Sequence, residues 1–242
     1  GGGGARAAAP AAGPAEGRLL GCTPSARGDG EVAAFAFYKP RCMLTDLKKG
    51  DMLKAAQAMA ATLPGQPTGL PKPVGQLDKH TTGLMLFTAS GLLTEHLNNH
   101  VSKVYRVWYL GCAGPGIATR GELTEQECAS LKEGVYLQKE QVHARFDSVK
   151  LLGGKELPSF IQESGAMVKK FVYCAEVTIK CGVFHVVKRL FDRVGKAVSS
   201  LERVQVAGLR LDGLELESPG AFCRLTQEHL ELLWGDCDCR AR

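Results

Sequence analysis

The 242-residue sequence has no long uninterrupted apolar run, although 45% of its residues are hydrophobic. No stretch approaches the roughly 18 apolar residues of a membrane-spanning helix, so we expect no membrane partner. Its nine cysteines are scattered and lack the dense, regular spacing of a small disulfide-stabilised secreted domain. They are typical of reduced thiols in an intracellular protein, whether in the cytoplasm, the nucleus or an organelle such as a plastid or mitochondrion.

The sequence also lacks the short motifs of metal and nucleotide sites. It contains no C-x-x-C pair and no glycine-rich phosphate-binding loop, and Cys237 and Cys239 form only an isolated C-x-C. We therefore expect no metal and no cofactor. Strands and helices are mixed without the regular βαβ period of a doubly wound sheet, which predicts an α+β fold.

Composition divides the chain into three parts. Residues 1–31 are rich in glycine, alanine and proline without a periodic apolar pattern, so they cannot bury enough surface to offset the entropy of ordering. We predict a disordered tail there, which fits either a linker or the remnant of a transit peptide. One folded domain is expected over residues 32–236, followed by a short tail over residues 237–242.

The apolar pattern predicts a series of short elements in the domain. A strand halted by Pro40 opens it, and Asp51 is placed to cap the helix that follows. Thr124 and Glu127 have the spacing of a capping box. The expected strands are 32–39, 74–77, 83–88, 104–111, 144–151, 171–181 and 200–211, and the expected helices are 51–62, 92–100, 124–134, 184–194 and 226–234.

A single acidic residue stands within the segment VGQLDKHTTGLMLFTASG, residues 74–91. Asp78 follows one short predicted strand and precedes a polar loop that closes at Gly83. The next strand, 83–88, alternates too little to be exposed on one face, so we expect it to be buried on both. An aspartate in this place can simply bind the backbone amides of the loop. The residues alone leave its role open.

Three blocks of the sequence, in the same order, resemble the RsuA/RluE-type pseudouridine synthases. They are FYKPRCMLT at 37–45, GQLDKHTTGLMLFTASG at 75–91 with a K-x-Y motif at Lys103–Tyr105, and a region that begins FHVVKRLF at 184–191 and extends to 233. The resemblance covers most of residues 33–234. It implies the pseudouridine synthase fold, in which helices flank a mixed, mostly antiparallel central sheet with a catalytic cleft.

The resemblance also implies an activity, the conversion of a uridine within RNA to its carbon-linked isomer. Asp78 matches the family's nucleophile at the base–sugar junction, Lys188 matches the basic residue that pairs with it, and Tyr105 matches the aromatic that packs against the flipped base. The lack of an acidic neighbour suits this role, because a nearby carboxylate would favour the protonated form of Asp78. Without the resemblance, Lys188 fits a solvated charge and Tyr105 fits a strand core.

A second set of residues is expected to bind the substrate or to shape the loop around it. Thr81 and Thr82 are suited to fixing the loop backbone, and Gly83 permits a conformation that other residues avoid. We expect His80 to lie at the surface and His185 to start a helix, neither with a catalytic role. The candidate substrate-binding residues are Gln76, Thr81, Thr82, Lys103 and Arg189.

Three positions depart from the family pattern. Gln76 stands where the family usually has an arginine that contacts RNA and fills the space left by the flipped base. Glutamine can bind a base edge but supplies no charge. Cys42 replaces a glycine, and Val186 replaces a glutamine. These changes affect RNA affinity and substrate choice before they affect catalysis.

Charge is concentrated in one stretch of the chain. Residues 167–196 hold seven lysines and arginines against Glu176 and Asp192, a surplus of five that equals the net charge of +5 of the whole chain. Such a stretch fits a phosphate-rich partner or a solvated face. With the resemblance, we expect the partner to be RNA, with ribosomal RNA first and transfer RNA second, and we expect a monomer.

Two other functions compete with an RNA-modifying enzyme. Gln76 and Val186 are compatible with a non-catalytic RNA-binding or ribosome-assembly factor on the same scaffold, whereas Asp78, Tyr105 and Lys188 favour catalysis. A metal-dependent hydrolase would have to use His80, His185 and the cysteines near the end of the sequence. The lack of a C-x-x-C pair argues against this hydrolase.

Overall fold

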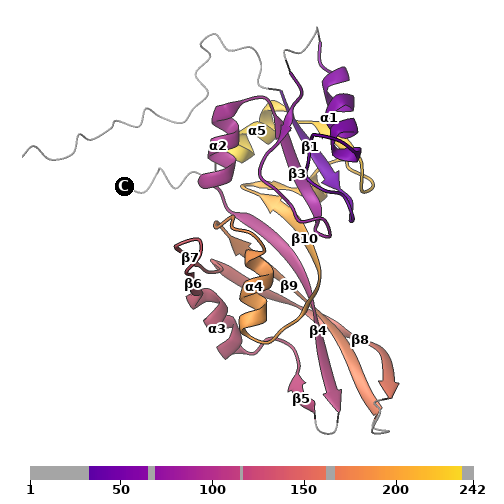
Figure 1. Ribbon diagram of the computed structural model, residues 1–242, viewed down its shortest axis with the longest axis vertical. Helices are drawn as coiled ribbons and strands as arrows, with labels where there is room; N and C mark the ends of the chain where they lie inside the picture. The colour runs from indigo at the N-terminus through magenta and orange to yellow at the C-terminus, as the bar shows by residue number, and fades with distance from the viewer. Residues whose placement is uncertain (1–32, 65–68, 115–116, 162–166, 236–242) are drawn as a thin grey trace, which may run out of the picture.

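The computed structural model describes residues 33–64, 69–114, 117–161 and 167–235, and these form an α+β fold (Figure 1). The predicted disordered tail 1–31 and the tail 237–242 lie outside the described residues. The elements are β1 (Ala34–Lys39), α1 (Asp51–Ala61), β2 (Lys72–Pro73), β3 (Thr82–Thr88), α2 (Gly91–Asn99), β4 (Lys103–Gly114), β5 (Ile117–Arg120), α3 (Glu125–Glu133), β6 (Val135–Leu137), β7 (Val142–Ala144), β8 (Ser148–Ile161), β9 (Met167–Ile179), α4 (Val186–Arg193), β10 (Val198–Val206), β11 (Leu209–Arg210), the 3₁₀ turn η1 (Leu211–Gly213), β12 (Phe222–Arg224) and α5 (Gln227–Trp234).

One large sheet organises the described chain. Its path runs β12-β1-β3-β10-β4-β9-β8, with β11 beside β10, β2 beside β3 and β5 beside β4. Neighbouring strands are antiparallel except for β3 and β10, which run parallel. The mixed, mostly antiparallel sheet predicted from the sequence is confirmed. The parallel pair is the point where the two halves of the sheet join.

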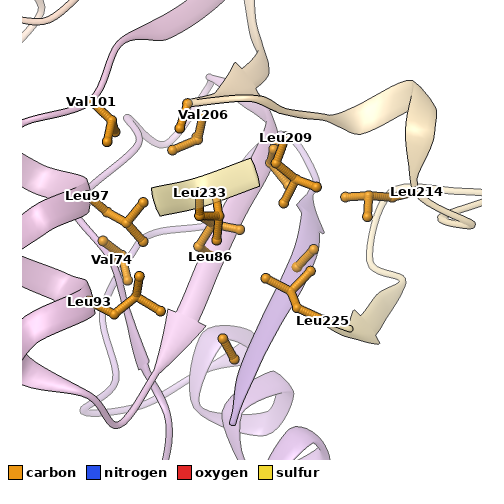
Figure 2. Packing of buried hydrophobic residues seen from close by; sticks show 14 of the residues in the cluster. Val74, Leu86, Leu93, Leu97, Val101, Val206, Leu209, Leu214, Leu225 and Leu233 are labelled. Atoms are coloured by element: carbon orange, nitrogen blue, oxygen red, sulfur yellow. The ribbon is translucent and has the colours of Figure 1, made fainter. Parts of the chain in front are cut away.

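Helices cover both faces of the sheet around β1 and β3. Ala36 and Leu86 pack with the side chains of α2 and α5 in one core cluster, which Figure 2 shows from close by. Their neighbours Phe37 and Phe87 point to the other face, where they meet α1 and each other with ring centroids 5.9 Å apart. β3 is therefore buried on both faces, as the lack of alternation predicts.

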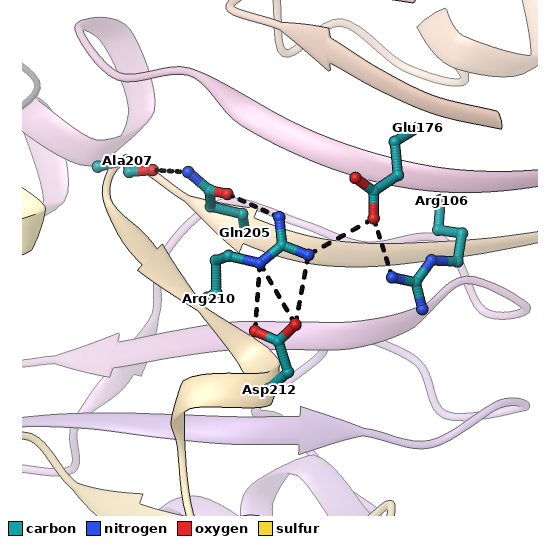
Figure 3. Close-up of polar contacts among 6 residues, drawn as sticks. All are labelled: Arg106, Glu176, Gln205, Ala207, Arg210 and Asp212. Atoms are coloured by element: carbon teal, nitrogen blue, oxygen red, sulfur yellow. Dashed lines mark hydrogen bonds and ion pairs between the residues drawn. The ribbon is translucent and has the colours of Figure 1, made fainter. Parts of the chain in front are cut away.

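The half of the sheet formed by β4 and β9 is different on its two faces. On one face, Tyr109 packs against Phe191 of α4, and α3 adds Leu131 to the same cluster. The opposite face carries charged side chains that bond across strands (Figure 3). Arg106 donates to Glu176 at 2.9 Å, and Arg210 reaches the same carboxylate at 3.5 Å.

Most predicted elements are present, but three local predictions are wrong. Residues 74–77 form no strand, because Gly75 turns the chain at φ 68° and the Thr45 hydroxyl binds the backbone of Leu77 instead. Asp51 does not cap α1, since Gly50 occupies the cap without a side-chain bond. The predicted strand 144–151 is interrupted between β7 and β8. The capping box of Thr124 and Glu127 at α3 is confirmed.

Candidate active site

A cleft of about 1060 Å³ lies between the loop that precedes β3 and the segment that joins β9 to α4. Sites that bury a drug-sized ligand have volumes of roughly 300–1,000 Å³. The cleft is therefore large enough for more than one nucleotide. Residues 74–79 line it from one side and residues 180–187 from the other, with Tyr105 of β4 also in its wall.

Asp78 lies in this cleft opposite two basic side chains of the α4 region. Lys188 Nζ donates to Asp78 Oδ2 at 2.8 Å, and His185 Nε2 is 3.2 Å from the same oxygen. The Asp78 side chain is only 20% exposed. A lysine ammonium at this distance forms a charge-assisted hydrogen bond with the carboxylate. The fold thus joins two groups that are 110 positions apart in sequence.

Helix α4 fixes the position of these basic groups. Its other side is anchored in the core by Val187, Leu190 and Phe191, all of which are buried. His185 and Lys188 are three residues apart, and residues at this spacing lie on the same side of a helix. Both therefore face Asp78 while the apolar side of the helix packs on the sheet.

Lys39 supports the loop of Asp78 from beneath, a role that the sequence did not predict. It ends β1 and is fully buried. Its Nζ lies within 2.9–3.3 Å of the carbonyl oxygens of residues 40, 78, 79 and 81. Burial lowers the pKa of Lys39 to about 8, against the opposite effect of the nearby Asp78 carboxylate. The Lys39 ammonium group thus binds backbone carbonyl oxygens that are not part of a helix or strand, and it stabilises the loop in this way.

Gly83 fixes the other end of the loop. Its φ is 107°, a conformation that side chains rarely adopt, and a Cβ there would lie 2.3 Å from the Arg203 carbonyl oxygen. The side chain of Arg203 is buried and donates from Nε to the Leu84 carbonyl at 2.8 Å. The loop therefore enters β3 at a place where only glycine fits.

Three of the predicted substrate-binding residues line the cleft. Gln76 is exposed, so its amide is accessible to a ligand. Thr81 is 1% exposed, and its buried hydroxyl has no hydrogen-bond partner among the described residues. Lys103 is buried, donates to the Asn98 carbonyl at 3.0 Å, and has its pKa lowered to about 8 by burial and by Arg203.

The other two predicted substrate-binding residues have partners elsewhere. Thr82 is outside the cleft lining, and its hydroxyl is 3.5 Å from the Leu201 carbonyl. Arg189 is also outside the lining and bonds Glu140 with both terminal nitrogens, at 2.9 and 3.3 Å. For these two residues, substrate binding stays a prediction that the geometry does not support.

The basic stretch 167–196 does not form one continuous surface. Lys196 is only 4% exposed, donates to the Gly121 carbonyl at 2.9 Å and pairs with Glu127 at 3.2 Å. The prediction that Lys196 belongs to a solvated cationic face is therefore wrong. Lys188 and Arg189 are paired as described above. Arg193 is exposed at the end of α4.

Of the two histidines named from the sequence, His80 belongs to the loop of Asp78, and His185 contacts the Asp78 side chain. His80 is exposed, as predicted, with Nδ1 3.7 Å from the Cys42 thiol. Cys42 has a φ of 66°, which explains why a glycine would suit this position. His185 does start α4, as predicted. Its contact with Asp78 was not predicted, although the spacing to Lys188 is a signal that could have revealed it.

No group of three or more histidine, cysteine, aspartate or glutamate side chains in the described ranges could hold a metal ion. His96 and His100 have the four-residue spacing of a helical metal site, but His96 Nε2 is 3.0 Å from the Leu233 carbonyl and its ring stacks on Trp234. The described helices include none that is long and apolar enough to span a membrane.

The family model of RNA pseudouridylate synthase matches residues 34–193, which include Asp78, Tyr105 and Lys188. The chain belongs to this family. The match confirms the resemblance to pseudouridine synthases that is seen in the sequence. The match extends from β1 through α4 and thus covers both walls of the cleft.

Relatives within the family are moderately similar. The ribosomal small subunit pseudouridine synthase A of Vibrio vulnificus (strain CMCP6) is 28% identical over 163 residues, 66% of this chain and 58% of that protein. The uncharacterized RNA pseudouridine synthase YtzG of Bacillus subtilis (strain 168) is 29% identical over 170 residues, 67% of this chain and 58% of that protein. The chain thus spans less than two thirds of the length of these relatives.

A solved structure supports the fold. The crystal structure of a pseudouridylate synthase superposes with a TM-score of 0.55 at 23% identity, over 84% of this chain and 74% of that one. The pseudouridine synthase fold predicted from the sequence is confirmed.

Proposed function

We propose that this chain is an RNA pseudouridine synthase that isomerises a specific uridine in structured RNA, with Asp78 as the nucleophile. The observation that carries the proposal is the 2.8 Å ion pair that Lys188 makes with Asp78, a carboxylate that lines the same cleft as Tyr105. A carboxylate that is paired with a cation and shielded on one side can attack the base–sugar junction of a uridine. A base must leave its stack to reach it.

The reaction rearranges bonds within one nucleotide. Asp78 attacks C1′ as the bond between N1 and C1′ breaks, the base turns, and C5 forms the new bond to C1′ while the bond from Asp78 to C1′ breaks. C5 then releases its proton and N1 gains one, so the atoms balance without a redox step. This chemistry requires only the carboxylate, its cation and a ring surface to hold the base. Asp78, Lys188 and Tyr105 match these three requirements.

Ribosomal RNA is the substrate class that we favour. The Vibrio vulnificus relative is named for the small ribosomal subunit. A second relative, from Vibrio cholerae serotype O1 (strain ATCC 39315 / El Tor Inaba N16961), is named for the large ribosomal subunit. This second relative is 32% identical to the chain, over 57% of this chain and 36% of its own length. Transfer RNA is the second class. One chain supplies all the groups named above, which supports action as a monomer. An RNA substrate also implies an intracellular location.

Mapping of pseudouridines tests the proposal. Total RNA is compared from cells with and without the protein, and cells without it are complemented with wild-type, Asp78→Asn or Asp46→Asn protein. We expect one site to be lost and then restored by the wild type but not by Asp78→Asn, since the amide cannot act as a nucleophile. Asp46 is an exposed carboxylate that also lines the cleft, and its variant should restore the site.

Two outcomes would reject the proposal. Restoration of the site by Asp78→Asn would remove this carboxylate from the chemistry. An unchanged set of pseudouridines, together with RNA binding by the purified protein, would favour the non-catalytic RNA-binding factor on the same scaffold.

A further inference from the structure

We propose that Phe184 is a stacking platform for a nucleobase next to the target uridine, and that His185 supports its ring from behind. This inference rests on the proposed function, because it assigns a binding role at the same cleft. Phe184 lines the cleft in the segment between β9 and α4 and is 72% exposed. An aromatic ring this exposed, in a wall built for a ligand, has a free face.

The ring is held in a defined orientation. The Phe184 and His185 rings are stacked, with centroids 3.7 Å apart and planes at 17°. His185 in turn lies 3.2 Å from the Asp78 carboxylate. A platform, its support and the nucleophile are therefore connected by direct contacts. A base placed on the free face of Phe184 would lie beside the uridine at Asp78.

The backbone keeps this pair in place. His185 has a φ of 55°, in the left-handed region that non-glycine residues seldom adopt. It is the N-cap of α4, where its carbonyl accepts from the Arg189 amide at 2.9 Å and the Val186 amide donates to the Val183 carbonyl at 3.2 Å. These bonds and the buried side of α4 hold the residue in a strained conformation. The ring of Phe184 is thus positioned before any ligand arrives.

A nucleobase is the ligand that suits this surface. When a uridine is extruded, the bases on either side lose a stacking partner, and single-stranded RNA is commonly held by aromatic rings. Gln76, on the same cleft, has no planar cation that could stack on a base, unlike an arginine. Phe184 supplies the flat surface that Gln76 cannot. The cleft also has room for a second nucleotide beside the first.

A binding experiment with short RNA tests the platform. The probe is a fluorescein-labelled nonamer of uridine, measured by anisotropy against the full chain, and a second nonamer carries 2-aminopurine next to its central uridine. We expect Phe184→Ala and Phe184→Leu to bind the nonamer about 5-fold to 150-fold more weakly, the range of one lost base–aromatic stack. Phe184→Trp should bind as tightly as the wild type, and 2-aminopurine emission should be quenched only by the aromatic variants.

The matched control is Leu92→Ala. Leu92 is 73% exposed, almost as much as Phe184, but it lies on α2 outside the cleft lining, so its removal should not change binding. Loss of a stack should also leave the slope of log affinity against log salt concentration unchanged, whereas loss of one phosphate contact lowers that slope by roughly 0.7. Thermal unfolding of each variant identifies any that fails to fold.

Several results would overturn the platform. These are wild-type affinity of Phe184→Ala, full affinity of Phe184→Leu, an equal loss in Leu92→Ala, or a changed salt slope in Phe184→Ala. Binding of the nonamer requires no turnover, so this experiment gives an answer even if no isomerisation is ever found. Conversely, suppose that the protein isomerises uridine but its Phe184→Ala variant binds the nonamer with wild-type affinity. That result would reject the platform and leave the proposed function in place.

Discussion

At the scale of single residues, the cleft surrounds one carboxylate with positive groups that have separate tasks. Lys188 binds the side chain of Asp78 at 2.8 Å, whereas Lys39 binds its backbone carbonyl at 3.2 Å. The first contact holds the carboxylate itself and the second holds the loop that carries it. Substitution of Lys188 should therefore change the rate of the reaction, whereas substitution of Lys39 should change the stability of the loop.

Lys188 is expected to affect turnover more than binding. Lys188→Met keeps the length of the side chain but removes the cation that orients and balances Asp78, so the rate at saturating RNA should fall by roughly 100-fold. The dissociation constant for RNA should change little, because the ammonium is already engaged by the protein. Single-turnover rates and a binding titration separate the two quantities.

Arg193→Met provides the control for this prediction. Arg193 is an exposed cation on the same helix, outside the cleft lining. Its removal should leave the rate at saturation unchanged, even if it weakens binding at low salt. Equal effects of the two variants on affinity, with unchanged rates in both, would mean that Lys188 only contacts phosphate.

The side-chain pair of Asp78 and Lys188 could be predicted from sequence because it lies in long motifs. Other residues of the site could not. Nothing in the sequence shows that Lys39 is fully buried, since that depends on how the loop of residues 78–81 folds over β1. The same holds for Lys196, which was predicted to be exposed but is buried beside Glu127 of α3, 3.2 Å away. Such partners are set by tertiary contacts.

At the scale of elements, the loop of Asp78 depends on its exit into β3. Gly83 pairs with Arg203 of β10 in the parallel part of the sheet, and the backbones approach too closely for a side chain. The parallel pairing thus fixes where the loop ends and where Asp78 stands relative to α4. The sequence predicted an unusual conformation for this glycine, and its φ of 107° confirms it.

Gly83→Ala should therefore destabilise the protein strongly. The new Cβ would lie 2.3 Å from a backbone oxygen of Arg203, and the backbone conformation would be strained as well. We expect the free energy of unfolding to fall by about 3 kcal/mol, measured by urea denaturation. Gly91→Ala is the control, because a Cβ there meets no atom within 4 Å. A similar, small effect of both changes would contradict the close approach.

Elements with strong local signals were predicted correctly, and those set by distant contacts were not. The capping box of α3 contains its own hydrogen bonds, and the apolar side of α4 is evident from its spacing. In contrast, residues 74–77 have the composition of a strand but turn at Gly75 and bind Thr45, 32 positions away from Leu77. Composition carries no information about such a partner.

At the scale of the whole molecule, the cleft lies where the two halves of the sheet meet, and buried lysines accompany it there. Lys39 and Lys103 are 0% and 8% exposed, and burial lowers the pKa of each from 10.5 to about 8. Holding these groups charged costs stability, which is compatible with a site built to bind a polyanion. The cost should be visible in how stability depends on pH.

Between pH 8 and 10.5, the unfolded chain holds a proton on Lys103 that the folded chain has released. Stability rises with pH wherever the unfolded state binds more protons, so this group favours folding as the pH increases through that window. From pH 7 to pH 9 its contribution is about 1 kcal/mol. Above pH 10, Tyr38 and Tyr109 act in the opposite direction, because burial raises the pKa of each to about 12. Measurements should therefore stop at pH 9.

The expected result is a difference in slope between two proteins. Urea denaturation at pH 7, 8 and 9 should show that the wild type gains about 1 kcal/mol more than Lys103→Met over this range, because methionine carries no proton to release. Lys39 acts equally in both proteins and cancels in the comparison. Lys79→Met, which removes an exposed lysine of the same cleft, should retain the wild-type slope. Identical slopes for the wild type and Lys103→Met would show that Lys103 keeps its proton in the folded protein, and the cleft would then hold one more positive charge at pH 9 than these contacts imply.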